Sequence, residues 1–211
     1  GVDATTGNPV KPVAYEYELC FRCHGDSNGK GAAHVARQFP ETDTSVEFDA
    51  GNINGSFHPI ETKGNNSSVP SLISPRWSVD SRIYCTDCHN NDEGPGAGGS
   101  GPNGPHGSIY EPLLERNLTT TDGPESAADY ALCYKCHSRS SILANDSFPE
   151  HAEHVLGAWP TSTSTGTTCS TCHDPHSGAK PAYLIRSVSD DPAGLCYECH
   201  LEKKYIRGTG H

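Results

Sequence analysis

All ten cysteines of the chain occur in five copies of one pattern, Cys-x-x-Cys-His. Two thiols at this spacing can add to the two vinyl groups of one porphyrin, and the following histidine then lies under the ring and binds the iron as proximal ligand. The pattern therefore predicts five covalently bound haem c groups. The cysteines are Cys20, Cys23, Cys85, Cys88, Cys133, Cys136, Cys169, Cys172, Cys196 and Cys199, and the proximal histidines are His24, His89, His137, His173 and His200.

Two other uses of ten cysteines have to be weighed against haem. Paired Cys-x-x-Cys motifs also build zinc sites, but zinc does not require a histidine after every second cysteine, and five half-sites do not pair evenly. An even number of cysteines also fits a disulfide framework. A disulfide framework leaves the five adjacent histidines unexplained, so haem is the preferred interpretation.

The composition indicates a fold built around cofactors. Only 33% of the 211 residues are hydrophobic, and the chain has 22 glycines and 16 prolines. Such a chain has too little apolar surface to offset the entropy lost on ordering. Haem rings would supply the missing core, so we expect mostly irregular coil with a few short α-helices and very little β-structure. The chain without haem should be largely unfolded.

The motifs alternate between two types. Those beginning at residues 20, 133 and 196 have leucine before the first cysteine and an aromatic residue after it, whereas those at 85 and 169 have a small hydroxyl residue after it. The flanking segments repeat as well. We expect a two-haem unit at 1–118, a second at 119–188 and a single-haem half unit at 189–211, together forming one continuous haem-cored domain.

Helix signals are few and local. The stretch 149–156 is predicted to be a short helix, and Ser126 is predicted to begin a turn that runs into Leu132. Asp191-Pro192 has the pattern of a helix start. The stretches 90–105 and 161–168 have the composition of loops.

The second axial ligands are predicted to be histidines, which gives bis-histidine, six-coordinate, low-spin haems of low potential. The chain has no methionine, which excludes Met/His ligation, and seven histidines lie outside the motifs. The repeat aligns His58 with His154 and His106 with His176, and His151 lies three residues before His154, on the same face of a helix. The distal candidates are His58, His106, His151, His154 and His176. His34 and His211 have no counterpart in the repeat and are further possible distal ligands, either in this chain or for a haem of a neighbouring subunit.

Taken together, the chain resembles the doubled-CXXCH multihaem cytochromes of the broad cytochrome c3-like class. The resemblance covers about 13–200 and includes Cys-His-Asp-Pro-His at 172–176 and Phe-His-Pro at 57–59. It implies that two histidines three residues apart serve neighbouring haems. Cytochromes c3 have four haems, so their arrangement does not transfer directly to five motifs. Relatives of the doubled-motif type include periplasmic carriers and extracellular filament-forming cytochromes, in some of which a haem takes its distal histidine from the adjacent subunit.

Charge and hydropathy restrict location and partners. The net charge is −11, and no basic patch for nucleic acid is present. No run of about 18 apolar residues predicts a membrane span. Thioether attachment of haem takes place outside the cytoplasm, and the start at Gly1 is interpreted as a mature form after signal removal. We expect an extracytoplasmic protein, at the cell surface or outside the cell, with the periplasm as the alternative.

Electron transfer is the expected function, because closely spaced bis-histidine haems offer no open position for a substrate. One version is the protomer of an extracellular filament, assembled head to tail, that passes electrons to external acceptors. The alternative is a soluble periplasmic shuttle that works with other redox proteins. A multihaem reductase is the third hypothesis, and it is disfavoured because every motif here ends in histidine.

Overall fold

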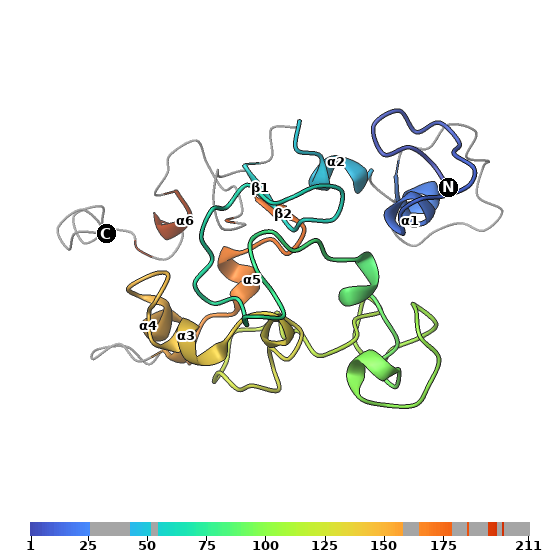
Figure 1. Ribbon diagram of the computed structural model, residues 1–211. Coiled ribbons are helices and arrows are strands. Elements are labelled where there is room, and N and C mark those ends of the chain that lie inside the picture. The colour runs from blue at the N-terminus through green and yellow to red at the C-terminus, as the bar shows by residue number, and fades with distance from the viewer. Residues whose placement is uncertain are drawn as a thin grey trace.

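Coil and turns make up most of the computed structural model, which describes residues 1–25, 43–51, 55–157, 165–178, 185, 194–197 and 200 (Figure 1). The described helices are short, and the described sheet has two strands of two residues each. This confirms the expected fold class. The elements are α1 (Tyr17–His24), α2 (Ser45–Phe48), β1 (Ser56–Phe57), η1 (Cys85–Asp87), η2 (Pro95–Ala97), η3 (Cys133–Lys135), α3 (Arg139–Leu143), α4 (His151–Leu156), α5 (Cys169–Cys172), β2 (Ser177–Gly178) and α6 (Gly194–Tyr197).

Each Cys-x-x-Cys-His motif coincides with helical structure. The first motif ends α1, and η1, η3 and α5 begin at the first cysteine of the next three, while α6 contains the first cysteine of the fifth. In four motifs the histidine N–H donates to the carbonyl of the first cysteine. The N···O distances are 2.8 Å at His89, 3.0 Å at His137, 2.8 Å at His173 and 2.8 Å at His200.

The antiparallel pair of strands joins two segments that are far apart in the sequence. Ser56 pairs with Gly178 and Phe57 with Ser177, so the segment before the second motif lies beside the segment after the fourth. The ladder continues on both sides, because Gly55 N–H donates to Gly178 O at 3.0 Å and His58 N–H donates to His176 O at 3.1 Å. The middle of the molecule is thus built from both halves of the chain (Figure 1).

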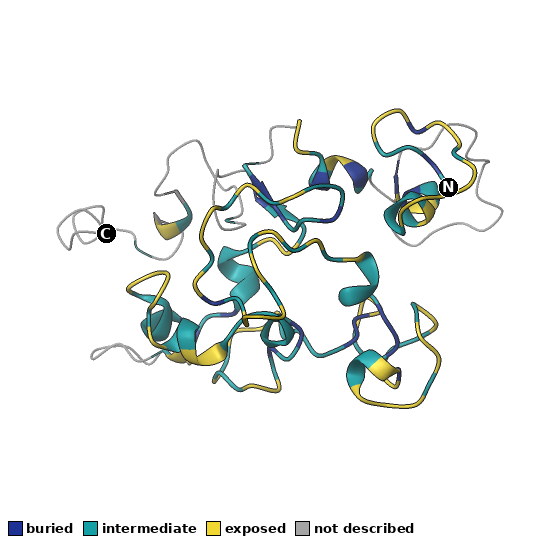
Figure 2. Cartoon of the chain, viewed as in Figure 1, coloured by how far each residue is buried: buried dark blue, intermediate teal, exposed yellow. Residues whose placement is uncertain are grey.

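Among the described residues, apolar packing is sparse and local. The largest cluster of buried side chains surrounds α1, where Phe21 packs with Val2, Phe48 and Ile60. Further along the chain, buried apolar residues occur singly or in pairs, as at Tyr130 and Leu132. Figure 2 shows buried residues in short stretches rather than in one continuous layer. Such a core is too small to stabilise a chain of this length without additional apolar material.

The local predictions can be compared with the structure where it describes the residues. The helix predicted at 149–156 is present as α4 and ends at Gly157, which has φ 67°, the left-handed conformation common after a helix. Ser126 begins the predicted turn, since its Oγ accepts from Asp129 N–H at 3.2 Å. Asp191-Pro192 lies outside the described residues. Among the described helices, none has the length and apolar character needed to cross a membrane.

Candidate functional site

The helical turn at each motif puts its reactive groups on one side. Residues three and four apart on a helix share a face. The first cysteine, the second cysteine and the histidine therefore emerge together from a single turn, as haem attachment requires. The nine described cysteines form no disulfide with one another, so their thiols are available for thioether bonds; Cys199 lies outside the described residues.

Thiols of successive motifs meet in pairs. The side chains of Cys20 and Cys85 are in hydrogen-bonding contact, and they lie with a Glu16 carboxylate oxygen within 4.8 Å of one another. The side chains of Cys133 and Cys169 are in the same kind of contact. The first and second motifs are therefore neighbours in space, and so are the third and fourth.

Residues between the cysteines connect one motif to the next. Glu16, just before α1, accepts hydrogen bonds from Thr86 N–H at 3.1 Å and from Thr86 Oγ at 2.8 Å, which ties the first motif to the second. Lys135 of the third motif donates to the carbonyl of Asp87 in the second motif at 2.6 Å. The same ammonium lies 2.9 Å from Glu115 Oε1, and both side chains are buried.

Three ring pairs have the spacing of two imidazoles on one iron. A ligating nitrogen lies about 2 Å from the metal and about 1 Å from its own ring centre, so the two ring centres are about 6 Å apart. Each observed pair joins a motif histidine to one outside the motifs. The pairs are His89 with His176 at 6.1 Å, His173 with His151 at 6.3 Å, and His200 with His154 at 6.0 Å.

Three other histidines, His24, His58 and His137, lie close enough to members of these pairs to interact with them electrostatically. His24 is near enough to His89 to affect its pKa. His58 is within electrostatic reach of His173 and His176, and His137 is within reach of His58 and His173. The histidines thus form a connected series from the first motif to the fifth.

The ring nitrogens of six histidines are arranged as in metal-binding imidazoles, in which Nδ1 usually bonds to the protein and fixes the ring orientation. In every case Nδ1 is the bonded nitrogen, which directs Nε2 elsewhere. The partners are Pro175 O for His58, Pro112 O for His89 (3.1 Å), Ser71 Oγ for His137 (2.9 Å), Ser147 Oγ for His151 (3.4 Å), Glu150 O for His154 (2.8 Å) and Glu47 Oε2 for His176 (2.7 Å).

Burial keeps most of these imidazoles neutral, which is the form that binds a metal. Burial, reinforced by the nearby His58 and His173, lowers the pKa of His137 to about 4. It also lowers the pKa of His89 and that of His151. His176 differs from these residues, because its hydrogen bond to Glu47 raises its pKa despite burial.

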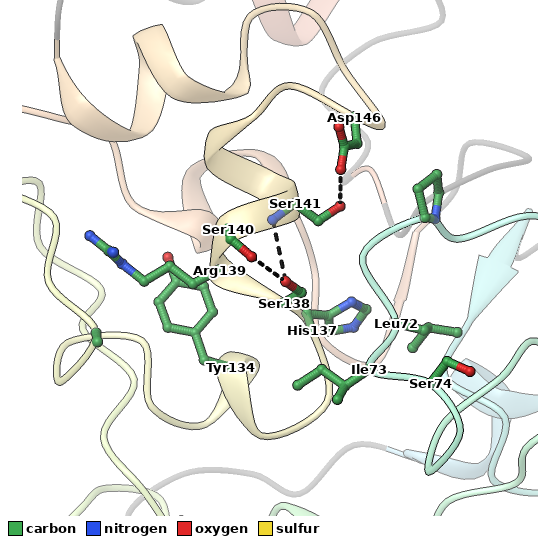
Figure 3. A pocket seen from close by; sticks show the side chains of 12 residues that line it. Leu72, Ile73, Ser74, Tyr134, His137, Ser138, Arg139, Ser140, Ser141 and Asp146 are labelled. Atoms are coloured by element: carbon green, nitrogen blue, oxygen red, sulfur yellow. Dashed lines mark hydrogen bonds between the residues drawn. The ribbon is translucent and has the colours of Figure 1, made fainter.

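A cavity of 760 Å³ opens beside His137, a volume in the range of cofactor and ligand sites. Its apolar wall includes Leu72 and Ile73, and Ile73 N–H donates to Cys136 O at 3.0 Å. Figure 3 shows this segment on one side and the start of α3, with its serines, on the other. The third motif therefore has an apolar wall and a polar rim next to its histidine.

Apolar side chains lie exposed immediately before two attachment cysteines. Leu19, next to Cys20, is 55% exposed, and Tyr84, next to Cys85, is 59% exposed. Both side chains offer apolar surface next to a point at which a porphyrin would be attached. Together with the Nδ1 bonds, the neutral imidazoles and the three ring spacings, this shows that the residues fit c-type haem.

The two Pro-His positions aligned by the repeat have different surroundings. His176 lies against Glu47 and His89, whereas His106 is exposed and makes no ring contact with any described histidine. The repeat alone does not distinguish them, because their immediate sequences are alike. His34 and His211 lie outside the described residues, and the ligand roles of all seven histidines stay predictions.

Sequence reasoning missed the residues that connect the motifs and support the histidines, chiefly Glu16, Glu47 and Glu115. One signal was present: Asp87 and Lys135 have opposite charges at the same position of successive motifs, which is consistent with motifs that meet. No comparable local signal marks the three glutamates, whose partners are distant in sequence.

Comparison with known proteins supports the interpretation of the motifs. A protein-family model described as the doubled CXXCH motif matches residues 163–205, which contain the fourth and fifth motifs. No curated protein and no solved structure matches the chain. The matched motif supports a multihaem c-type cytochrome, and the Cys-x-x-Cys-His motifs indicate covalently bound haem c.

Proposed function

We propose that the chain transfers electrons along five c-type haems with bis-histidine ligation, and that it does so as the protomer of an extracellular cytochrome filament. The connected series of histidines is the observation that carries the first part. It links all five motifs in chain order, with three ring pairs at the spacing of axial ligands. Haem iron held by two histidines exchanges electrons without binding a substrate.

We infer the axial pairs from the same geometry. His176 serves the haem at His89, His151 the haem at His173, and His154 the haem at His200. His58 serves the haem at His137, since it is the remaining described candidate within electrostatic reach of that histidine. The haem at His24 takes His34, His106 or a histidine of a neighbouring protomer.

The positions of the first and fifth motifs support assembly into a filament. The first motif, in α1, and the fifth, in α6, lie on opposite sides of the molecule (Figure 1). Haems at two opposite ends can each approach a haem of another copy, and such head-to-tail contacts do not close on themselves, so they give fibres. A protomer with this arrangement would continue the electron path from one copy to the next.

Haem analysis and electron microscopy of the purified holoprotein test the proposal together. Mass spectrometry should give five haems per chain, and the resting ferric EPR spectrum should contain low-spin signals only. Micrographs should show filaments with a regular axial repeat. Monomeric particles with five low-spin haems would replace the filament by a soluble periplasmic shuttle. A high-spin signal from one haem in five, with turnover of nitrite or hydroxylamine, would replace electron transfer by a reductase.

A further inference from the structure

We infer that Glu47 is a positioning residue for the haem attached at Cys85 and Cys88: its carboxylate orients His176 toward the iron and lowers the reduction potential of that haem. The inference rests on the proposed pairing of His176 with His89. It concerns a residue outside the five motifs that has no signature in the sequence.

The geometry around His176 is fixed from several directions. Glu47 Oε2 lies 2.7 Å from His176 Nδ1. Phe48, the next residue of α2, is buried and packs its ring against the same imidazole at 5.3 Å between ring centres. On the other side, His58 N–H donates to His176 O at 3.1 Å. The ring is therefore held in one orientation, with Nε2 directed away from Glu47.

A carboxylate at Nδ1 sets His176 apart from the other five histidines. Their Nδ1 atoms meet backbone carbonyls or serine hydroxyls, which are neutral. No described lysine or arginine pairs with Glu47, so among the described residues its charge is directed at His176 alone. Among the six histidines, His176 therefore has the strongest hydrogen-bond acceptor at Nδ1.

That difference has an electronic consequence. A hydrogen bond from Nδ1–H to a carboxylate increases the electron density on the ring and raises its basicity as a ligand. A more basic axial ligand stabilises ferric iron over ferrous iron, and second-sphere hydrogen bonds are one of the means by which proteins set haem potentials. The haem in the second motif should therefore be harder to reduce than it would be with a neutral partner on His176.

The test is spectroelectrochemical titration of the holoprotein carrying Glu47→Gln, which keeps the side-chain shape and removes the charge. One of the five potentials should rise, so that at a fixed potential the ratio of reduced to oxidised haem at that site increases about tenfold, equal to about 59 mV for one electron. The low-spin EPR signal of one haem should change as well. Glu93→Gln is the matched control, because Glu93 is exposed and contacts no described histidine; it should leave all five potentials and signals unchanged.

A second variant, His176→Ala, tests which of the five haems Glu47 affects. His176→Ala should convert one ferric haem to high spin, and adding Glu47→Gln to it should cause no further shift of the potentials. If Glu47→Gln leaves five low-spin haems with unchanged potentials, or shifts them equally in both backgrounds, the role of Glu47 is refuted while electron transfer by five haems stands. If His176→Ala leaves every haem low-spin, the proposed pairing fails, and the inference fails with it.

Discussion

Lys135→Met is expected to destabilise the junction between the second and third motifs severely. Lys135 has a side chain only 8% exposed, and its Nζ lies 2.9 Å from Oε1 of Glu115, whose side chain is 1% exposed. Methionine has nearly the same length and apolar stem but no charge. It would leave the carboxylate of Glu115 buried without its closest counter-charge, and breaking a buried pair from one side typically costs about 3–5 kcal/mol.

Other contacts place the cost near the lower end of that range. Glu115 Oε2 keeps a hydrogen bond from Asn90 Nδ2 at 3.0 Å, and Arg116 Nε lies 3.5 Å from Oε1, the oxygen that Lys135 contacts. The carbonyl of Asp87 loses its donor at 2.6 Å. The expected loss of unfolding free energy for Lys135→Met is therefore about 3 kcal/mol.

Urea unfolding of the oxidised holoprotein, followed by circular dichroism, measures this loss. Glu115→Gln in the same chain is the matched variant, and the double variant should recover at least 1 kcal/mol relative to Lys135→Met because the uncompensated charge is gone. If the unfolding free energy of Lys135→Met lies within about 0.5 kcal/mol of that of the unaltered chain, the pair of Lys135 and Glu115 is not desolvated. A double variant no better than Lys135→Met would show that lost packing, and not the charge, causes the effect.

Three other changes test separate parts of the structure. Gly166→Ala should destabilise the holoprotein by about 2 to 4 kcal/mol in urea unfolding, because φ is +94° and a Cβ would collide with the carbonyl of Val155; an unchanged midpoint would contradict this. Burial and the carboxylate of Asp49 raise the pKa of Glu61 from 4.5 to about 7, so the folded state holds this proton more tightly than the unfolded chain. The contribution of Glu61 to stability should then be greatest below pH 4.5 and fall by about 1 to 2 kcal/mol up to pH 7, less than the full shift implies because the carboxyl group is partly exposed. Glu61→Gln should remove that decline, and an equal decline in both chains would refute the assignment. His151→Ala should give one high-spin ferric haem in five by EPR, whereas five low-spin haems would exclude His151 as an iron ligand.

The sequence was sufficient for features that depend on nearby residues. Low hydrophobic content with many glycines and prolines predicted coil, and the turn at Ser126 and the helix at 149–156 follow from capping and helix spacing. The cofactor type also follows from local spacing, because a thiol pair and its histidine occupy one helical turn. These are short-range effects, in which a few consecutive residues determine the outcome.

Contacts between segments that are distant in the sequence could not be predicted from the sequence. His106 and His176 have the same Pro-His context, and only the approach of α2 and of β1 distinguishes the second from the first. Glu115 is also ordinary in sequence, and its buried carboxylate is paired with Lys135 of the third motif, twenty residues further along the chain. Periodicity cannot supply such information, because the described part of the chain has no long helix or strand and these contacts follow no repeating interval.

The short ladder between β1 and β2 has a consequence for the order in which the chain can fold during synthesis. Residues 56–58 in the first half find their partners only at 176–178, so a chain ending before that point cannot complete the surroundings of the second motif. Closing a loop of this size requires an entropic cost that local contacts do not offset. The segment before the second motif must therefore remain without its partner strand until residues 176–178 have been made, near the end of the chain, whereas the cluster around Phe21 needs only residues of the first half.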